Sequence, residues 1–268
     1  MAITAEVSAL AYRPTSTRHA NLRDRSIMQA GNRVSRSGSA AIGNRLLASL
    51  PASVSRPLLA ASEQVRLPLD TVLCRTGQRV QHVYFPIDSF ISMLATSNGD
   101  VPLEVGLVGD EGMLGLNLVL GIDRAPLQGI VQGAGLCWRL EARDFERALA
   151  ARPAFHRQLN RYLYVTLAQL AQTTVCTRFH VVEARLARWL LMTQDRAQAN
   201  AFHVTQEFLA FMLGVRRVGV TKAARSLQHR ELIQYSRGNI IVLDRRGLKA
   251  AACGCYKADL ESYDRVLG

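Results

Sequence analysis

The chain has 268 residues, of which 49% are hydrophobic and 20% are charged. This composition is that of a globular protein and excludes a wholly disordered chain. The length allows two modest domains, each with a core of its own. The formal net charge of +12 indicates an anionic partner; nucleic acid is the first candidate, and an anionic membrane surface is the second.

The sequence has the features of a cytoplasmic protein. Its apolar runs stay well short of the roughly 20 residues that cross a bilayer, and the N-terminus lacks the apolar core of a secretory signal. The five cysteines are scattered and odd in number, which suits a reducing compartment. We therefore expect a cytoplasmic location and no membrane partner.

The N-terminal segment, residues 1–40, is predicted to be a flexible basic tail. It holds six arginines among Ser, Ala, Thr and Asn, and its apolar residues show no sustained period. In residues 44–67 the apolar side chains recur near the helical period, with interruptions at Pro51 and Pro57. This second segment is predicted to be helical.

From residue 71 the pattern changes to short runs rich in β-forming residues. The runs cover residues 71–74, 82–85, 90–95, 101–105 and 136–140, and turn signals lie at 75–78, 97–100 and 108–112. Many short strands at regular spacing predict a small antiparallel barrel or sandwich.

Helices are expected to follow the strands. Residues 141–151 predict one helix, and a long one follows Pro153 over about residues 154–176. Its apolar stripe either packs on the chain's own barrel or pairs with a second copy; its length and connecting position favour pairing into a homodimer. Another amphipathic helix, over residues 183–192, begins the last domain.

Residues 204–227, VTQEFLAFMLGVRRVGVTKAARSL, predict two helices joined by a tight turn. Thr205 suits the N-cap of the first helix, and Glu207 suits the positive end of its dipole. Ala210 and Gly214 leave room for a crossing helix, and Gly214 suits a left-handed helix end. The apolar residues spaced to share a core between the two helices are Leu209, Leu213, Val220 and Leu227.

The second helix, from about Arg216 to Gln228, is rich in cations. The start of this helix in a helix-turn-helix enters the major groove, where arginine can donate two bonds to guanine. Residues 231–243 predict two strands around a turn, with Arg237 at its tip, which gives a winged arrangement. An ordinary solvated basic helix is the alternative, and the crossing residues and the turn favour DNA binding.

On these residues the chain resembles the Crp/Fnr family of bacterial transcription regulators, from about residue 44 to 250. The signature is residues 205–227 followed by Leu232-Ile233 and Arg237-Gly238-Asn239-Ile240, and the RLARWL run at 185–190 is also similar. The resemblance implies an α+β fold: an N-terminal antiparallel β-barrel (cyclic-nucleotide-binding-like, jelly-roll type), a long dimerisation helix and a C-terminal winged helix-turn-helix. The expected parts are the tail at 1–40, the sensor domain at 41–152, the dimerisation helix at 153–178, the DNA-binding domain at 179–250 and an extension at 251–268.

The function implied by the resemblance is sequence-specific transcription regulation by a homodimer on a palindromic operator in double-stranded DNA, with RNA polymerase recruited or obstructed. The family often has Ser, Arg, Glu and Arg at the reading positions, where this chain has Arg216, Arg217, Val218 and Lys222. Arg217 and Lys222 therefore inherit the base contacts, whereas Val218 cannot accept from a cytosine amino group, so the operator should differ. Gly219 costs about 1 kcal/mol relative to Ala in a helix and suggests a close approach to the groove. The predicted DNA-binding residues are Thr205, Gln206, Arg216, Arg217, Val218, Thr221, Lys222, Arg225 and Arg237.

The resemblance also implies an effector pocket in the barrel. Cyclic-nucleotide binders of this fold use a Gly-Glu pair for the ribose and an Arg followed by Ser or Thr for the phosphate. This chain has Asp110-Glu111-Gly112 and Arg124-Ala125-Pro126 in roughly those places, so the hydroxyl is absent and Pro126 removes an amide donor. The barrel is predicted to be either a structural element or a divergent sensor for an unknown small molecule, with Glu111, Gly112 and Arg124 as the binding residues of such a sensor. A cyclic-nucleotide-binding allosteric signalling module is the alternative function.

No cofactor, metal or catalytic activity is predicted. An iron–sulfur cluster takes four cysteines, and none precedes Cys74. Cys253-Gly-Cys255 could form a metal or redox pair with another group, but two thiols alone are an incomplete site. No local motif supports haem ligation by a histidine. Walker, nucleophile-elbow and zinc-protease motifs are absent from the sequence, which argues against an enzyme.

Overall fold

The computed structural model describes residues 42–96 and 102–268. The predicted basic tail and the turn predicted at residues 97–100 lie outside this part of the chain. Among the helices that are described, none combines the length and the apolar character that crossing a membrane requires.

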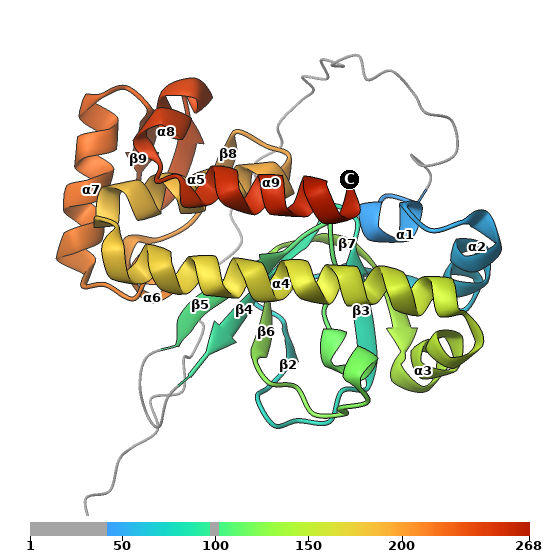
Figure 1. Ribbon diagram of the computed structural model, residues 1–268. Helices are drawn as coiled ribbons and strands as arrows, with labels where there is room; N and C mark the ends of the chain where they lie inside the picture. Colours follow the sequence, from blue (N-terminus) through green and yellow to red (C-terminus); the bar gives the residue numbers. More distant parts are fainter. Residues whose placement is uncertain (1–41, 97–101) are drawn as a thin grey trace, which may run out of the picture. The chain divides into compact units, whose positions relative to one another are not determined.

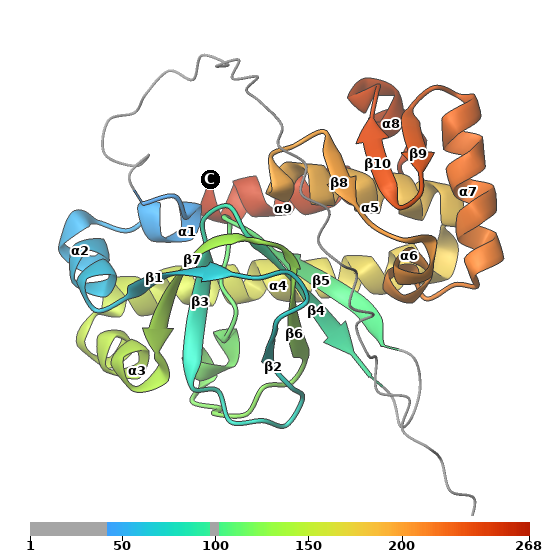
Figure 2. The ribbon, with the colours of Figure 1, turned by 180° about the vertical axis from the view of Figure 1, so that it is seen from behind.

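Two antiparallel sheets form the sensor part of the chain (Figures 1 and 2), with strand orders β1-β7-β3 and β2-β6-β4-β5. Val83, Phe85, Ile91 and Val131 are almost completely buried. The predicted antiparallel barrel is confirmed. The strands are β1 (Glu63–Leu67), β2 (Val72–Cys74), β3 (His82–Pro86), β4 (Phe90–Ala95), β5 (Leu103–Val108), β6 (Gln128–Gly133) and β7 (Gly135–Glu141), and the helical segments are α1 (Arg45–Ala48), α2 (Ala52–Ala60), η1 (Leu116–Leu120) and α3 (Ala142–Ala151).

The helical segment predicted for residues 44–67 is partly wrong. Helix α2 ends at Ala60, since Pro57 inside it lacks an amide donor and weakens the last turns. Residues 63–67 form strand β1, which pairs with β7 along its whole length. Strand β6 was not predicted, because its two glycines and two glutamines hide the apolar pair Ile130-Val131.

Helix α4 (Pro153–Phe179) confirms the predicted long helix and begins with proline, where a missing amide hydrogen removes no helical bond. Phe155, Leu159 and Tyr162 are buried in the core of the sensor part. The expectation that the apolar stripe pairs with a second copy is therefore corrected for this face, which packs on the chain's own barrel. A different face leaves Tyr164 and Leu167 exposed.

Helix α9 (Cys255–Leu267) lies alongside α4 in both views (Figures 1 and 2). The sequence pattern did not predict this helix. Its Asp259 forms a buried ion pair with Arg188 of α5, with a distance of 2.7 Å between Nη2 and Oδ2. The extension after residue 251 is thus a packed element of the fold.

A winged helix-turn-helix forms the C-terminal part of the chain. Its small sheet has the order β8-β10-β9, so a third strand joins the two that were predicted. Strand β8 was missed because it has only three residues, pairs only with β10, and exposes two of its three side chains. The elements are α5 (Val182–Ala197), β8 (Ala201–His203), α6 (Gln206–Leu213), α7 (Arg217–His229), β9 (Ile233–Ser236), β10 (Asn239–Val242) and α8 (Arg245–Ala251).

A buried carboxyl group joins the sensor sheet to α5. Glu104 of β5 accepts a hydrogen bond from Trp189 Nε1 at 2.8 Å and another from Ser92 Oγ at 2.6 Å. Burial raises the pKa of Glu104 to about 7, although these two hydrogen bonds favour the charged form. The joint between the sensor and α5 therefore contains a group that titrates near neutral pH.

The raised pKa of Glu104 makes the stability of the chain depend on pH. Because the folded chain binds this proton more tightly than the unfolded chain, the free energy of unfolding falls as pH rises from about 4.5 to about 7. We expect a loss of roughly 2–3 kcal/mol from this group between pH 5 and pH 8. The Glu104→Gln variant should lose this part of the pH dependence in urea unfolding.

The matched control for this experiment is Glu146→Gln, at an exposed position of α3. It should follow the wild type at both pH values. An unchanged pH dependence in Glu104→Gln would contradict the assignment.

Candidate nucleic-acid interface

We call α6, α7 and the turn between them the reading head, and its first helix begins and ends as the sequence predicts. Thr205 caps α6, with its Oγ1 accepting a hydrogen bond from the amide of Phe208 at 3.1 Å. Gly214 ends the helix in the left-handed conformation, with φ 59° and ψ 44°. Its missing side chain faces Leu103 of β5, so Gly214 serves the turn and not the crossing of the two helices.

Helices α6 and α7 share the core that the spacing predicts. Leu209, Leu213, Val220 and Leu227 all belong to one buried cluster with residues of α5. Thr221 Oγ1 donates to Gln206 Oε1 at 2.7 Å, which joins α7 to the first turn of α6. Buried Arg185 of α5 donates to the carbonyl oxygen of Leu213, where the cation meets the negative end of α6. These contacts hold α7 against α6, and α6 against α5.

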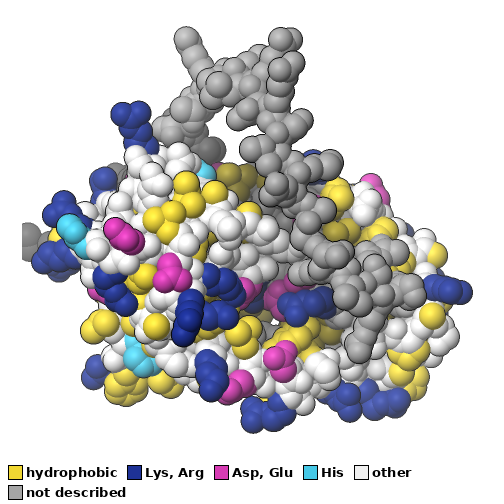
Figure 3. Space-filling view, turned by 90° about the horizontal axis from the view of Figure 1, so that it is seen from above, with side chains coloured by type: hydrophobic (Ala, Val, Ile, Leu, Met, Phe, Trp, Pro, Cys, Tyr) yellow, Lys and Arg dark blue, Asp and Glu magenta, His cyan; other side chains and the backbone are white. Residues whose placement is uncertain are grey.

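The predicted DNA-contacting cations lie exposed on this scaffold. They show no ion pair with any carboxylate in residues 42–96 and 102–268, although eleven such pairs form elsewhere in those residues. Figure 3 shows Lys and Arg side chains spread over the end of the molecule that holds α7 and α8. A set of cations without acidic partners is available to an anionic ligand. The set comprises Arg216, Arg217, Lys222 and Arg225 at the start and along α7, and Arg237 on the wing.

The wing is a hairpin with a two-residue turn at Arg237-Gly238. Both residues have positive φ, 49° and 83°, as a type I′ turn requires. Gly238 also lies against the ring of His203, so a larger residue would clash there. The turn presents Arg237 at the tip of the wing, exposed to solvent.

Comparison with known proteins gives the same fold and domain. The structure is similar to a Crp/Fnr family transcriptional regulator from Eubacterium rectale, with a TM-score of 0.63, 15% identity, and 78% of this chain and 98% of that chain covered. FixK2 from Bradyrhizobium japonicum is similar with a TM-score of 0.61 and 13% identity, and the match covers 72% of this chain and 98% of that chain. The structure is also similar to the c-di-GMP responsive global regulator CLP from Xanthomonas campestris. The TM-score is 0.60 and the identity is 18%, with 72% of this chain and 100% of that chain covered.

At the level of sequence, residues 184–251 match the family model of the Crp-like helix-turn-helix domain. The chain carries a Crp-like helix-turn-helix domain, and it has the fold of the Crp/Fnr transcription regulators. No curated protein matches its sequence. The predicted resemblance to Crp/Fnr regulators and the predicted fold class are confirmed.

The sensor part of the chain holds a cavity of about 400 Å³ between the barrel and α4. Arg124 and Pro126 line it, together with Tyr162 and Leu163 of α4. The guanidinium of Arg124 is engaged at the rim, where it donates to the carbonyl oxygen of Gly77 at 3.0 Å.

The two other predicted effector residues lie outside the lining of this cavity. Glu111 is buried and forms an ion pair with Arg196 of α5, with Nη2 and Oε1 2.5 Å apart. Gly112 lies against the ring and hydroxyl group of Tyr162. Glu111 and Gly112 thus lie apart from the cavity that Arg124 lines, and their role as effector contacts stays a prediction.

Gly219 in α7 has open space around it. A methyl group there would lie 3.9 Å from Val182 Cγ2, an ordinary contact distance. We expect Gly219→Ala to raise the free energy of unfolding by about 0.5–1 kcal/mol, because alanine loses less backbone entropy in a helix. Urea unfolding measures this change.

The matched control is Gly214→Ala, which should destabilise the chain because φ is positive and Leu103 lies 2.7 Å from the added carbon. A destabilised Gly219→Ala would mean that α7 differs from this structure. Since the folded chain has room for a methyl group, weaker DNA binding by Gly219→Ala would point to the predicted close approach to the groove.

Proposed function

We propose that this regulator acts as a homodimer that places α7 of each subunit in successive major grooves of a dyad-symmetric operator. The observation that carries the proposal is the set of exposed, carboxylate-free cations on α7 and the wing of a Crp-like domain. Two identical reading heads related by a two-fold axis read two half-sites about one helical turn apart.

The base contacts are assigned to the first turns of α7. Arg217 and Lys222 lie exposed on this helix and can donate to the O6 and N7 of guanine. Val218 exposes 64% of its surface beside them, although it is apolar. A valine in the major groove suits the methyl group of thymine, so we propose a thymine at this operator position.

The remaining predicted residues are assigned to placing the protein on the DNA, and not to reading its bases. Arg216, Arg225 and Arg237 meet phosphates, and Thr205 lies at the N-terminus of α6, where an anion is favoured. Gln206 and Thr221 hold one another by a hydrogen bond and so orient α7 against α6. Phosphate contacts of this kind set the affinity and its salt dependence, and the sequence preference comes from the base contacts.

Dimerisation is assigned to the exposed face of α4. Tyr164, Leu167, Ala171 and Val175 follow one another at spacings of three, four and four residues and are all exposed in the single chain. This spacing gives the seam of a two-stranded coiled coil. A contiguous apolar stripe on one helix indicates a protein partner, and a second copy places an equivalent stripe against it.

The cavity supports a second role as a small-molecule sensor. Its volume of about 400 Å³ lies in the usual range for ligand pockets, and most of its lining is apolar. Cyclic-nucleotide binding, the alternative function, is less well supported, because Glu111 is held by Arg196 and Pro126 has no amide hydrogen. A cytoplasmic location and contact with RNA polymerase rest on the family alone.

DNA binding is tested by alanine substitution of the two assigned base readers. We expect Arg217→Ala and Lys222→Ala each to weaken binding to a selected operator about 5- to 150-fold, the equivalent of roughly 1–3 kcal/mol. Arg225→Ala and Arg237→Ala should weaken binding to all sequences alike and reduce its salt dependence. Fluorescence anisotropy at several salt concentrations measures both effects.

Arg143→Ala removes an equally exposed cation from α3 and serves as the control. It should bind the operator as the wild type does. Normal operator binding by Arg217→Ala and Lys222→Ala together would overturn the assigned reading helix.

The dimer is tested at Ala171, in the middle of the exposed stripe. A glutamate there would place two like charges at the seam, so we expect Ala171→Glu to be monomeric at micromolar concentration and to bind operator DNA at least tenfold more weakly. Sedimentation velocity measures the change of mass. Ala150→Glu makes the same exchange at an exposed site of α3 and should remain dimeric. A dimeric Ala171→Glu protein would place the interface elsewhere.

A further inference from the structure

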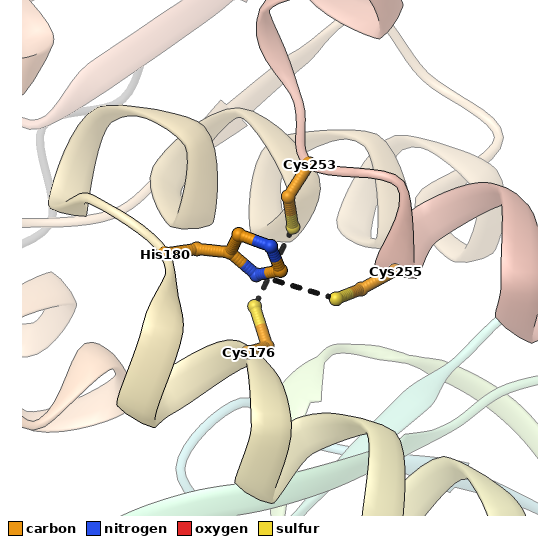
Figure 4. A group of neighbouring side chains, drawn as sticks. All are labelled: Cys176, His180, Cys253 and Cys255. Carbon is orange, nitrogen blue, oxygen red and sulfur yellow. Dashed lines mark hydrogen bonds between the residues drawn. The ribbon is translucent and has the colours of Figure 1, made fainter.

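Four metal-binding side chains meet where α4 ends and α9 begins (Figure 4). Cys176 and His180 lie one helical turn apart at the end of α4, and Cys253 and Cys255 come from the loop between α8 and α9. Figure 4 shows all four side chains directed to one point. Their ligand atoms all lie within 4.8 Å of one another.

The distances in this cluster match those of a single tetrahedral ion. Cys176 Sγ and Cys253 Sγ are 3.5 Å apart, and Cys255 Sγ and His180 Nδ1 are 3.4 Å apart. Zinc bonds of about 2.0–2.3 Å in a tetrahedron place the ligand atoms roughly 3.3–3.8 Å from one another. The four side chains therefore need only small movements to close around an ion.

We infer that Cys176, His180, Cys253 and Cys255 form a zinc site of the structural Cys3His kind. Four protein ligands complete a tetrahedron and leave no open position for water or substrate, so the site is structural and not catalytic. An iron–sulfur cluster places several atoms between its cysteines and needs them further apart than this cluster has them. Three thiolates with one imidazole are the donor set that zinc prefers over magnesium or calcium.

The surroundings of the cluster fit a zinc ion with three thiolates, which carries one net negative charge. Gln172 Nε2 donates to Cys255 Sγ at 3.0 Å, as an outer ligand would. The guanidinium groups of Arg185 and Arg188 lie beside Cys176 in the same pocket. Arg188 is paired with Asp259, whereas Arg185 donates to a backbone carbonyl oxygen, so the charge of Arg185 can offset that of the site.

The site joins three parts of the fold. His180 caps the end of α4 and lies two residues before α5, so the ion fixes the joint between these helices. The two cysteines of the loop tie the start of α9 to the same point. Arg185 connects the site to the carbonyl oxygen of Leu213, which precedes the turn of the reading head. The zinc would thus hold the reading head in a fixed position against α4.

The full chain, purified with a thiol reductant and zinc, tests this inference. Mass spectrometry of the elements should find one zinc per chain in the wild type and less than a tenth of that in Cys253→Ser, Cys255→Ser and His180→Ala. Cys137→Ala changes a buried cysteine of β7 outside the cluster and should keep the full zinc content. Cobalt added to zinc-free wild type should give the thiolate-to-cobalt absorption bands of a tetrahedral site, and these should be missing from Cys255→Ser.

A ligand variant that binds no zinc could simply be unfolded, so a second experiment uses the wild type alone. Removal of zinc with a chelator should lower the melting temperature by several degrees, and added zinc should restore it. This readout needs no DNA, so it stands or falls apart from the proposed function. The inference is overturned if reduced wild type binds no zinc, if it holds iron and sulfide, or if the ligand variants keep as much zinc as Cys137→Ala.

Discussion

The polar side chains of α5 hold the structure together. This helix is buried on several sides, and its arginines each meet a different part of the chain: Arg185 the end of α6, Arg188 the Asp259 of α9, and Arg196 the Glu111 of the sensor. Trp189 adds a hydrogen bond to Glu104 of the sensor sheet. In the two ion pairs, Arg188 with Asp259 and Arg196 with Glu111, removing one partner leaves the other charge buried and unpaired, which costs about 3–5 kcal/mol. The arrangement of sensor, long helix and reading head depends on this one helix.

Arginine has two separate roles in this chain, and the difference lies in its partners. The arginines of α5 are buried against carboxylates or carbonyl oxygens and act within the fold. Those of α7 and the wing are exposed and have no carboxylate partner in the described residues. Counting cations in the sequence cannot separate the two groups, because the partners of α5 lie far away along the chain. The net charge of +12 therefore includes buried arginines that are not available to an anionic partner as well as the exposed ones.

The elements that the sequence predicted best are those determined by residues adjacent in the chain. The cap at Thr205, the left-handed end at Gly214 and the alternation around the Arg237-Gly238 turn each depend on neighbouring residues, and the structure has all three. Strands β6 and β8 were missed because pairing with distant strands decides them and their own residues favour strand only weakly.

The candidate sites outside the helix-turn-helix also depend on residues that lie far apart along the chain. Glu111 has the position along the chain of an effector residue, but Arg196 lies 85 residues later and binds it. The pair Cys253-Gly-Cys255 is an incomplete site in the sequence, because the two side chains that complete the proposed site lie more than 70 residues earlier. The i, i+4 spacing of Cys176 and His180 at a helix end was a signal that could have completed the set.

The tip of the wing has a backbone conformation that does not favour the arginine proposed to contact DNA. Arg237 has φ 49°, a conformation that glycine or asparagine takes far more easily than a long side chain does. Asparagine or glycine at this position would make the hairpin more stable, yet neither carries a charge. The hairpin therefore gives up some of its own stability so that a cation stands at its tip.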